Sequence, residues 1–107
     1  MTVPAELEVT GRLQRALLSF QKAQGLLLTT HRRLKDLPAA EVEHFWAAQG
    51  DRIEKHLHAA AVEVLAAFQA FSAAGLVAEA GDRHLITEAR RLVAEGGWTA
   101  SAEARLA

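Results

Sequence analysis

The sequence contains no cysteine and only two prolines among its 107 residues. Without cysteine the chain can form neither a disulfide nor a thiolate metal site, and it has no thiol nucleophile. The prolines are Pro4 and Pro38, so long stretches contain no residue that breaks a helix. A large excess of one charge is also absent, because the formal net charge is −1. Bulk charge therefore gives no reason to expect nucleic acid or an anionic membrane as a partner.

No stretch has the pattern of a signal peptide or a membrane span. Residues 1–11 carry Glu6 and Glu8 and no apolar run, unlike a secretory leader. The most apolar window, residues 59–78, is long enough to span a bilayer, but it is largely alanine and contains Glu63. We therefore expect no membrane segment. The lack of cysteine fits a reducing compartment, and we expect a cytoplasmic protein.

Half of the residues are apolar, and long stretches lack β-branched runs, which favours helix throughout. We expect an all-α fold with one domain over residues 1–97 and a tail over residues 98–107. The three predicted helices cover about residues 4–35, 39–74 and 83–95. Leu37-Pro38 separates the first two helices, and Gly75 ends the second. Gly50-Asp51 could interrupt the second helix, but the apolar spacing continues across it, which favours one long helix.

The first predicted helix carries a seam of residues spaced alternately four and three apart, which is typical of helix pairs. Its members are Leu13, Leu17, Phe20, Gln24, Leu27, His31 and Leu34. A short turn at Pro38 folds the second helix back, so we expect a long antiparallel hairpin plus a short third helix. Charge agrees with this pairing. Residues 1–35 carry six basic and two acidic residues, whereas residues 36–82 carry two basic and eight acidic residues.

The seam does not account for all the apolar surface, because further apolar and small residues lie on other sides of both long helices. A helix that is apolar on every side needs cover on every side. A second copy of the chain would provide that cover, so we expect a homodimer that forms a four-helix bundle, with a monomer wrapped by its third helix and tail as the alternative. The residues expected in this interface are Leu7, Gly11, Leu18, Gly25, Leu26, Val62, Leu65, Ala66 and Ala70.

Five histidines raise the possibility of a metal site, since carboxylate-bridged bundles use Glu-x-x-His on inward helix faces. Glu41 and His44 have this spacing, and His31 is close to them across the turn. Glu54 and His58 form a second pair, four residues apart. Each group offers too few ligands for a closed site, so a solvated helical surface is the favoured interpretation. These five residues remain weak metal candidates.

The sequence contains no phosphate-binding loop, nucleophile elbow, zinc-protease motif or dinucleotide fingerprint. We therefore expect a non-enzymatic interaction or assembly module that acts as a helical homo-oligomer and binds no cofactor, with another protein as a further candidate partner. A bundle that binds a metal or small ligand is the alternative. A nucleic-acid-associated regulator is weaker, because the basic cluster of residues 31–35 lies at a helix end, where cations are favourable anyway. Trp98 could dock on the bundle or mark a partner site.

Overall fold

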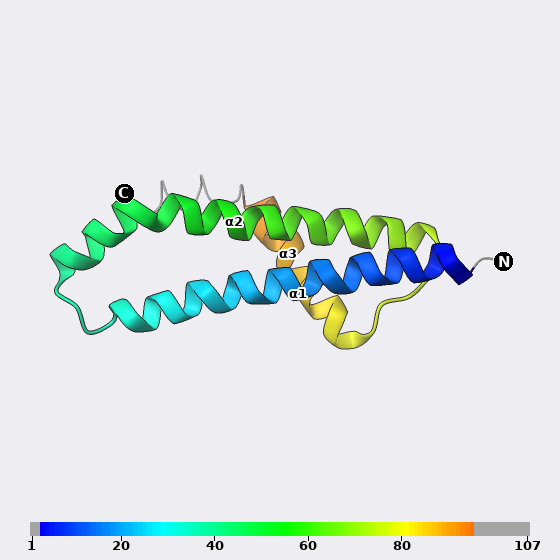
Figure 1. The fold of residues 1–107 in the computed structure, drawn as a ribbon, viewed down its shortest axis with the longest axis horizontal. Helices are drawn as coiled ribbons and strands as arrows, with labels where there is room; N and C mark the ends of the chain where they lie inside the picture. The colour runs from blue at the N-terminus through cyan, green and yellow to red at the C-terminus, as the bar shows by residue number, and fades with distance from the viewer. Residues whose placement is uncertain (1–2, 96–107) are drawn as a thin grey trace.

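The computed structural model describes residues 3–95, with side chains from residue 5 onward, and over that range its regular secondary structure is α-helix, with no strand. Three helices follow one another: α1 (Val3–Leu34), α2 (Ala39–Ala73) and α3 (Ala80–Ala94). Figure 1 shows α2 running back alongside α1 after the turn, with α3 lying across the pair. The molecule is elongated, with extents of 59 × 23 × 21 Å. The all-helical class predicted from the sequence is confirmed for the described residues.

The turn between α1 and α2 is built around Pro38. The Leu37 amide donates to the Leu34 carbonyl at 3.1 Å, which closes the end of α1. Pro38 then adopts extended backbone, with φ −57° and ψ 146°, and its carbonyl accepts the first hydrogen bonds of α2 from Glu41 and Val42. Proline suits this position because a helix-starting residue needs no amide donor. The second helix runs through Gly50 without a break.

Gly75 ends α2 with a left-handed backbone conformation, φ +83°, which side chains other than glycine rarely adopt. The Leu76 amide donates back to the Phe71 carbonyl at 3.4 Å, and Leu76 packs against the core. This is the arrangement of a Schellman helix end, in which the turn satisfies the free carbonyls of the last helical residues. The chain then crosses to α3 in a short extended connection.

α3 begins at Ala80, three residues earlier than the sequence predicted. Gly81 and Asp82 were expected to precede the helix, but they lie in its first turn. A glycine costs little there because the first turn has few hydrogen bonds to lose, and the carboxylate of Asp82 is favourable near the helix N-terminus. Gln14 Nε2 also donates to Asp82 Oδ2 at 3.0 Å, which attaches this first turn to α1.

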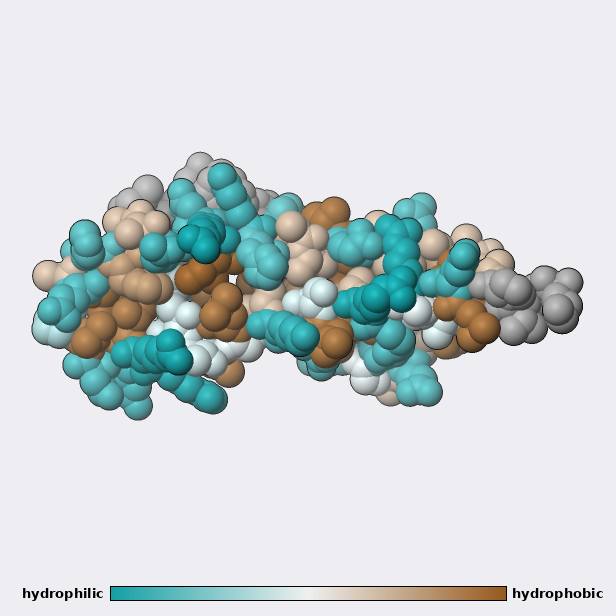
Figure 2. Space-filling view, viewed as in Figure 1, coloured by the Kyte–Doolittle hydropathy of each residue, from teal (hydrophilic) through white to brown (hydrophobic). Residues whose placement is uncertain are grey.

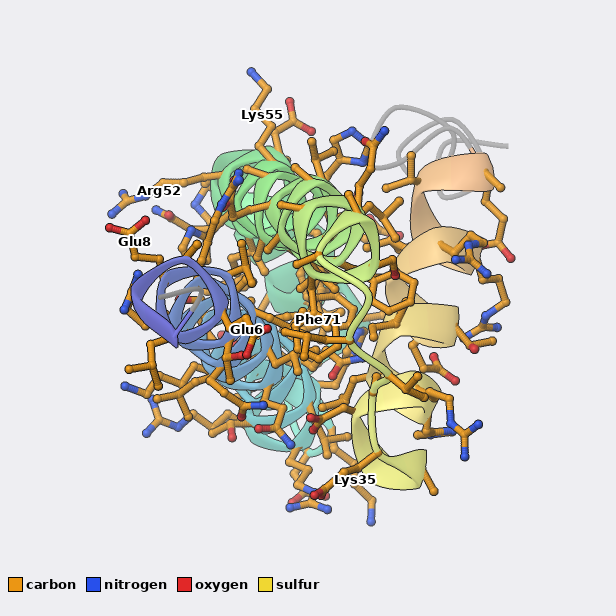
Figure 3. The ribbon with its side chains drawn as sticks, turned by 90° about the vertical axis from the view of Figure 1, so that its right-hand side faces the viewer. Glu6, Glu8, Lys35, Arg52, Lys55 and Phe71 are labelled. Atoms are coloured by element: carbon orange, nitrogen blue, oxygen red, sulfur yellow. The ribbon has the colours of Figure 1, made fainter. Side chains whose placement is uncertain are left out.

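The core lies where all three helices meet. Phe71 points into the space that they enclose (Figure 3), and Phe20, Leu13 and Val64 are the largest fully buried side chains. Alanines fill much of the remainder, which lets the helices approach closely. The buried alanines are Ala16, Ala23, Ala61, Ala67, Ala78 and Ala89. The tail of residues 98–107, including Trp98, lies outside the described residues. None of the described helices contains an apolar stretch of the length that a membrane crossing requires.

Candidate interaction surface at the turn end

Along the two long helices, the residues near the turn are less buried than the residues of the other half. We call residues 24–53, the half nearest the turn, the arm, and the rest of the described chain the body. Between Ala23 and Leu34 no residue of α1 is buried, and between Ala39 and Ile53 of α2 only Gly50 is buried. α3 lies across the body (Figure 1), and its C-terminal half, from Glu88 onward, lines a groove with Gln24, Leu27, Leu28 and His31 of the arm. Among the described residues, most of the arm is therefore a helix pair that α3 does not cover.

An open groove of about 600 Å³, which we call the tip groove, runs between α1 and α2 in the arm. Its lining residues come from both helices and the turn: Leu26, Thr30, Leu34, Leu37, Glu41, His44, Phe45, Ala48, Gln49 and Ile53. Arg52 follows Ala48 by one helical turn and points to the side of the molecule opposite α3 (Figure 3). The groove therefore opens away from α3, and Figure 2 shows apolar surface at the turn end of that face.

Large apolar side chains of the arm are accessible to water. Leu26 is 51% exposed, Leu28 is 52% exposed and Leu37 is 44% exposed. Trp46 connects the two helices through a tilted ring contact with His31, at 4.9 Å between ring centroids. Phe45 contacts Trp46 edge to face at 5.3 Å. Aromatic contacts thus hold the arm together, while its leucines remain uncovered by the described part of the chain.

From the turn as far as Asp51, the charges of the arm are separated by sign between the two helices, and Arg52, at the body end of the arm, is the exception. Every charged residue of residues 24–35 is basic: Arg32, Arg33 and Lys35. Every charged residue of residues 36–51 is acidic: Asp36, Glu41, Glu43 and Asp51. All seven side chains are exposed, and the ion pairs found within residues 3–95 involve other residues. The arm therefore presents a basic wall beside an acidic wall, with neither neutralised by the other.

In the body the same two helices do pair their charges. Arg12 Nε donates a hydrogen bond of 2.8 Å to Glu63 Oε1, between α1 and α2. This hydrogen bond lowers the pKa of the Glu63 carboxyl and raises the pKa of the Arg12 guanidinium. Both side chains are about half exposed, so solvent screening keeps the contribution of the pair small. The pair also shows which residues of α1 and α2 lie level with each other.

The residues expected in a dimer interface do not form one surface. Leu7, Gly11, Leu18 and Gly25 share a strip of α1, because spacings of four and seven residues return to nearly the same side of a helix. Of these and the other expected residues, Leu7, Leu18, Leu26 and Val62 are exposed, as is Gly25. Leu65 packs partly against the core, and Gly11, Ala66 and Ala70 are half-buried. Only Gly25 and Leu26 belong to the arm.

Val62 and the α1 strip face different sides of the molecule. In Figure 3 the side chain of Lys55 points away from α1. Val62 follows Lys55 by seven residues and therefore lies on the same side of α2. The α1 strip lies on the side of its own helix opposite the buried Leu13, Ala16 and Phe20, by the same count of 100° per residue. One flat partner surface cannot contact both sets at once.

The candidate metal ligands are also dispersed. Glu41 and His44 line the tip groove together, whereas the ring of His31 contacts that of Trp46. Glu54 is buried in α2, and His58 is half-buried with a buried Nδ1 that has no hydrogen-bond partner among the described residues. Within residues 3–95, no three His, Asp or Glu side chains gather closely enough to hold a metal ion. Two ligands at most share one site.

The sequence contains a signal for the open arm in the polar residues of the α1 seam. Gln24 and His31, the two polar members of that seam, both lie in the arm. In the body the seam consists of apolar residues, and Leu13, Leu17 and Phe20 are buried. Polar seam positions mark the part of a helix pair that stays partly in contact with water.

Comparisons of this chain with protein-family models, with curated proteins and with solved structures find no match. The fold and the surface together define a chain that is all-helical over residues 3–95 and whose described residues leave the tip groove open.

Proposed function

We propose that this chain is a non-enzymatic protein interaction module that acts as a homo-oligomer, in which the long helix pairs of two copies form a four-helix bundle. The observation that carries the proposal is the tip groove, where Leu26 and Leu37 are about half exposed. Contiguous apolar surface of this kind is characteristic of protein interaction sites. A symmetric second copy is the simplest partner, since most soluble oligomers are homo-oligomers.

Two other features support an interaction role over a chemical one. The grooves of the described chain are open, and their linings contain no arrangement of nucleophile, base and orienting group. The tip groove combines leucine and aromatic side chains with a charged edge, which is the usual composition of a protein contact surface. The metal-binding alternative lacks a site with three ligands within residues 3–95.

Sedimentation velocity of the full chain over a wide range of concentrations tests this proposal. We expect the weight-average mass to rise from that of one chain toward that of two. Leu26→Glu should shift the equilibrium toward the monomer, because it introduces a charge into the apolar groove. The matched control is Val77→Glu, which alters an 83% exposed residue in the connection between α2 and α3 and should leave association unchanged. A wild-type chain that stays monomeric at every concentration would contradict the proposal.

A further inference from the structure

The two walls of the tip groove carry opposite charges at their outer edges. Arg33 follows Leu26 by seven residues, so the two share one side of α1. Glu41 lines the groove itself, and it lies two helical turns before Ala48 on the same side of α2. Both charged side chains are exposed. A partner that covers the leucines of this groove therefore also meets one basic and one acidic edge.

Arg33 and Glu41 lie at nearly the same level along the molecule. The ion pair of Arg12 with Glu63 fixes how α1 and α2 are aligned. Both helices rise by the same amount per residue. Moving toward the turn by the same number of residues from Arg12 on α1 and from Glu63 on α2 therefore brings Arg33 level with Val42, the neighbour of Glu41. The contact of His31 with Trp46 agrees with this alignment to within one turn of helix.

We infer that the arms of two copies pack against each other through their tip grooves, around a two-fold axis parallel to the helices, with the basic wall of each arm against the acidic wall of the other. This inference rests on the proposed function and specifies its contact surface. A rotation about such an axis places α1 of one copy opposite α2 of the other. It leaves the position of every residue along the axis unchanged. Arg33 then lies beside the partner's Glu41, and Glu41 lies beside the partner's Arg33.

This arrangement accounts for the lack of ion pairs between Arg33 or Glu41 and any other residue of the range 3–95. In the body, Arg12 and Glu63 neutralise each other across α1 and α2. In the arm, Arg33 and Glu41 lie on separate walls and form no ion pair with other residues in the described range. A second copy supplies the opposite charge to each wall, while Leu26, Phe45 and Ile53 are covered between the walls.

The same geometry sets where the contact ends. Lys22 lies level with Ile53, next to Arg52, by the same count from the ion pair of the body. Around the two-fold axis, Lys22 of one copy approaches the partner's Arg52, and like charges oppose contact there. The two copies therefore touch along their arms and separate toward their bodies. Arg52→Glu should strengthen the dimer, since it replaces this repulsion with attraction.

Charge exchange between the two walls tests the inference. Arg33→Glu and Glu41→Arg should each weaken self-association by roughly tenfold, because each places two like-charged pairs in a symmetric dimer. An equimolar mixture of the two variants should restore dimerisation to near the wild-type level, because the mixed dimer contains only opposite pairs. The readout is sedimentation velocity at low salt, with one variant carrying a dye so that mixed dimers are counted separately.

The controls separate this inference from the proposed function. Leu7→Glu changes an exposed leucine of the body and should leave the dimer intact. Circular dichroism should show unchanged helix content in each variant, since all the substituted side chains are exposed. Suppose that the wild-type chain associates, that Leu7→Glu disrupts the association, and that mixing the two charge variants does not restore it. The proposed arm contact is then wrong, whereas the proposal of a homo-oligomer still stands. If the wild-type chain is monomeric, both ideas fail.

Discussion

Single residues of this protein differ greatly in how much stability they contribute. Phe20 is 1% exposed and lies in the body, where α1, α2 and α3 meet. Leu18, two residues earlier on the same helix, is about half exposed. The contrast arises because successive residues of a helix point in directions 100° apart. Only residues on the inner side of α1 are held by neighbours from the other helices.

Phe20→Ala should lower the free energy of unfolding by about 3–5 kcal/mol, because it removes apolar contacts and leaves a cavity in a close-packed core. Leu18→Ala, the matched control in the same helix, should change it by less than about 0.5 kcal/mol. Urea unfolding followed by circular dichroism at low protein concentration compares the two. Equal losses in both variants would show that the inner side of α1 has been assigned incorrectly.

The ion pair of Arg12 with Glu63 predicts a pH dependence. The hydrogen bond from Arg12 lowers the pKa of the Glu63 carboxyl in the folded chain. The folded state therefore holds the ionised carboxylate more strongly than the unfolded state does. The resulting stabilisation is complete above the ordinary glutamate pKa, about 4.3, and is lost as the pH falls through the lower pKa of the folded state.

Thermal unfolding from neutral to acid pH tests this dependence. Wild type should lose stability on acidification by slightly more than Glu63→Gln, which has no carboxyl at this position to titrate. The difference should be small, because both side chains are half exposed, and it should shrink further in high salt. Parallel curves for the two proteins in low salt would indicate that the pair contributes nothing in solution.

At the scale of helices, the ends are set by a few residues with special backbone requirements. Pro38 and Gly75 both predict helix boundaries from the sequence, and α2 runs from Ala39 to Ala73 between them. The start of α3 could not be placed in the same way. Gly81 and Asp82 are common both before a helix and in its first turn, and only the contact of Gln14 with Asp82 selects the second possibility.

Two glycines should respond to alanine in opposite directions. Gly75→Ala should destabilise the chain by about 1 kcal/mol, since Gly75 has φ +83° and alanine is strained there. Gly25→Ala should stabilise it by about 0.5–1 kcal/mol, because Gly25 lies inside α1 and alanine is the better helix former. A Cβ atom at either position meets no other atom within 4 Å, so steric clash affects neither. Denaturant unfolding of the two variants should give opposite signs, and matching signs would refute this assignment.

At the scale of the molecule, the sequence predicts an all-helical chain but not where along its length the core lies. The seam spacing continues from Leu13 to Leu34, so spacing alone assigns the arm and the body the same burial. The difference arises from α3, which lies across the body and borders the arm only with its C-terminal half, from Glu88 onward. Where a third helix docks depends on contacts between residues far apart in the sequence, and a single helical pattern does not contain that information.

Hydrogen exchange should report this division of the molecule. Backbone amides of α1 and α2 in the body should exchange slowly, since opening them requires disruption of the core around Phe20 and Val64. Amides in the arm should exchange faster in dilute protein, because few buried contacts hold them. Exchange followed by mass spectrometry at increasing protein concentration should show the arm becoming protected while the body changes little. Uniform protection at all concentrations would contradict the division into arm and body.

The separation of charge between the two walls of the arm also limits how large an assembly can grow. A contact in which each basic wall meets an acidic wall about a two-fold axis uses both walls of both copies at once. In the proposed dimer no wall is left free to recruit a third chain, so we expect the assembly to stop at two copies and not to extend into a filament. The same charges would also select partners. A chain with an acidic first helix and a basic second helix would place like charges together in this contact and would be repelled.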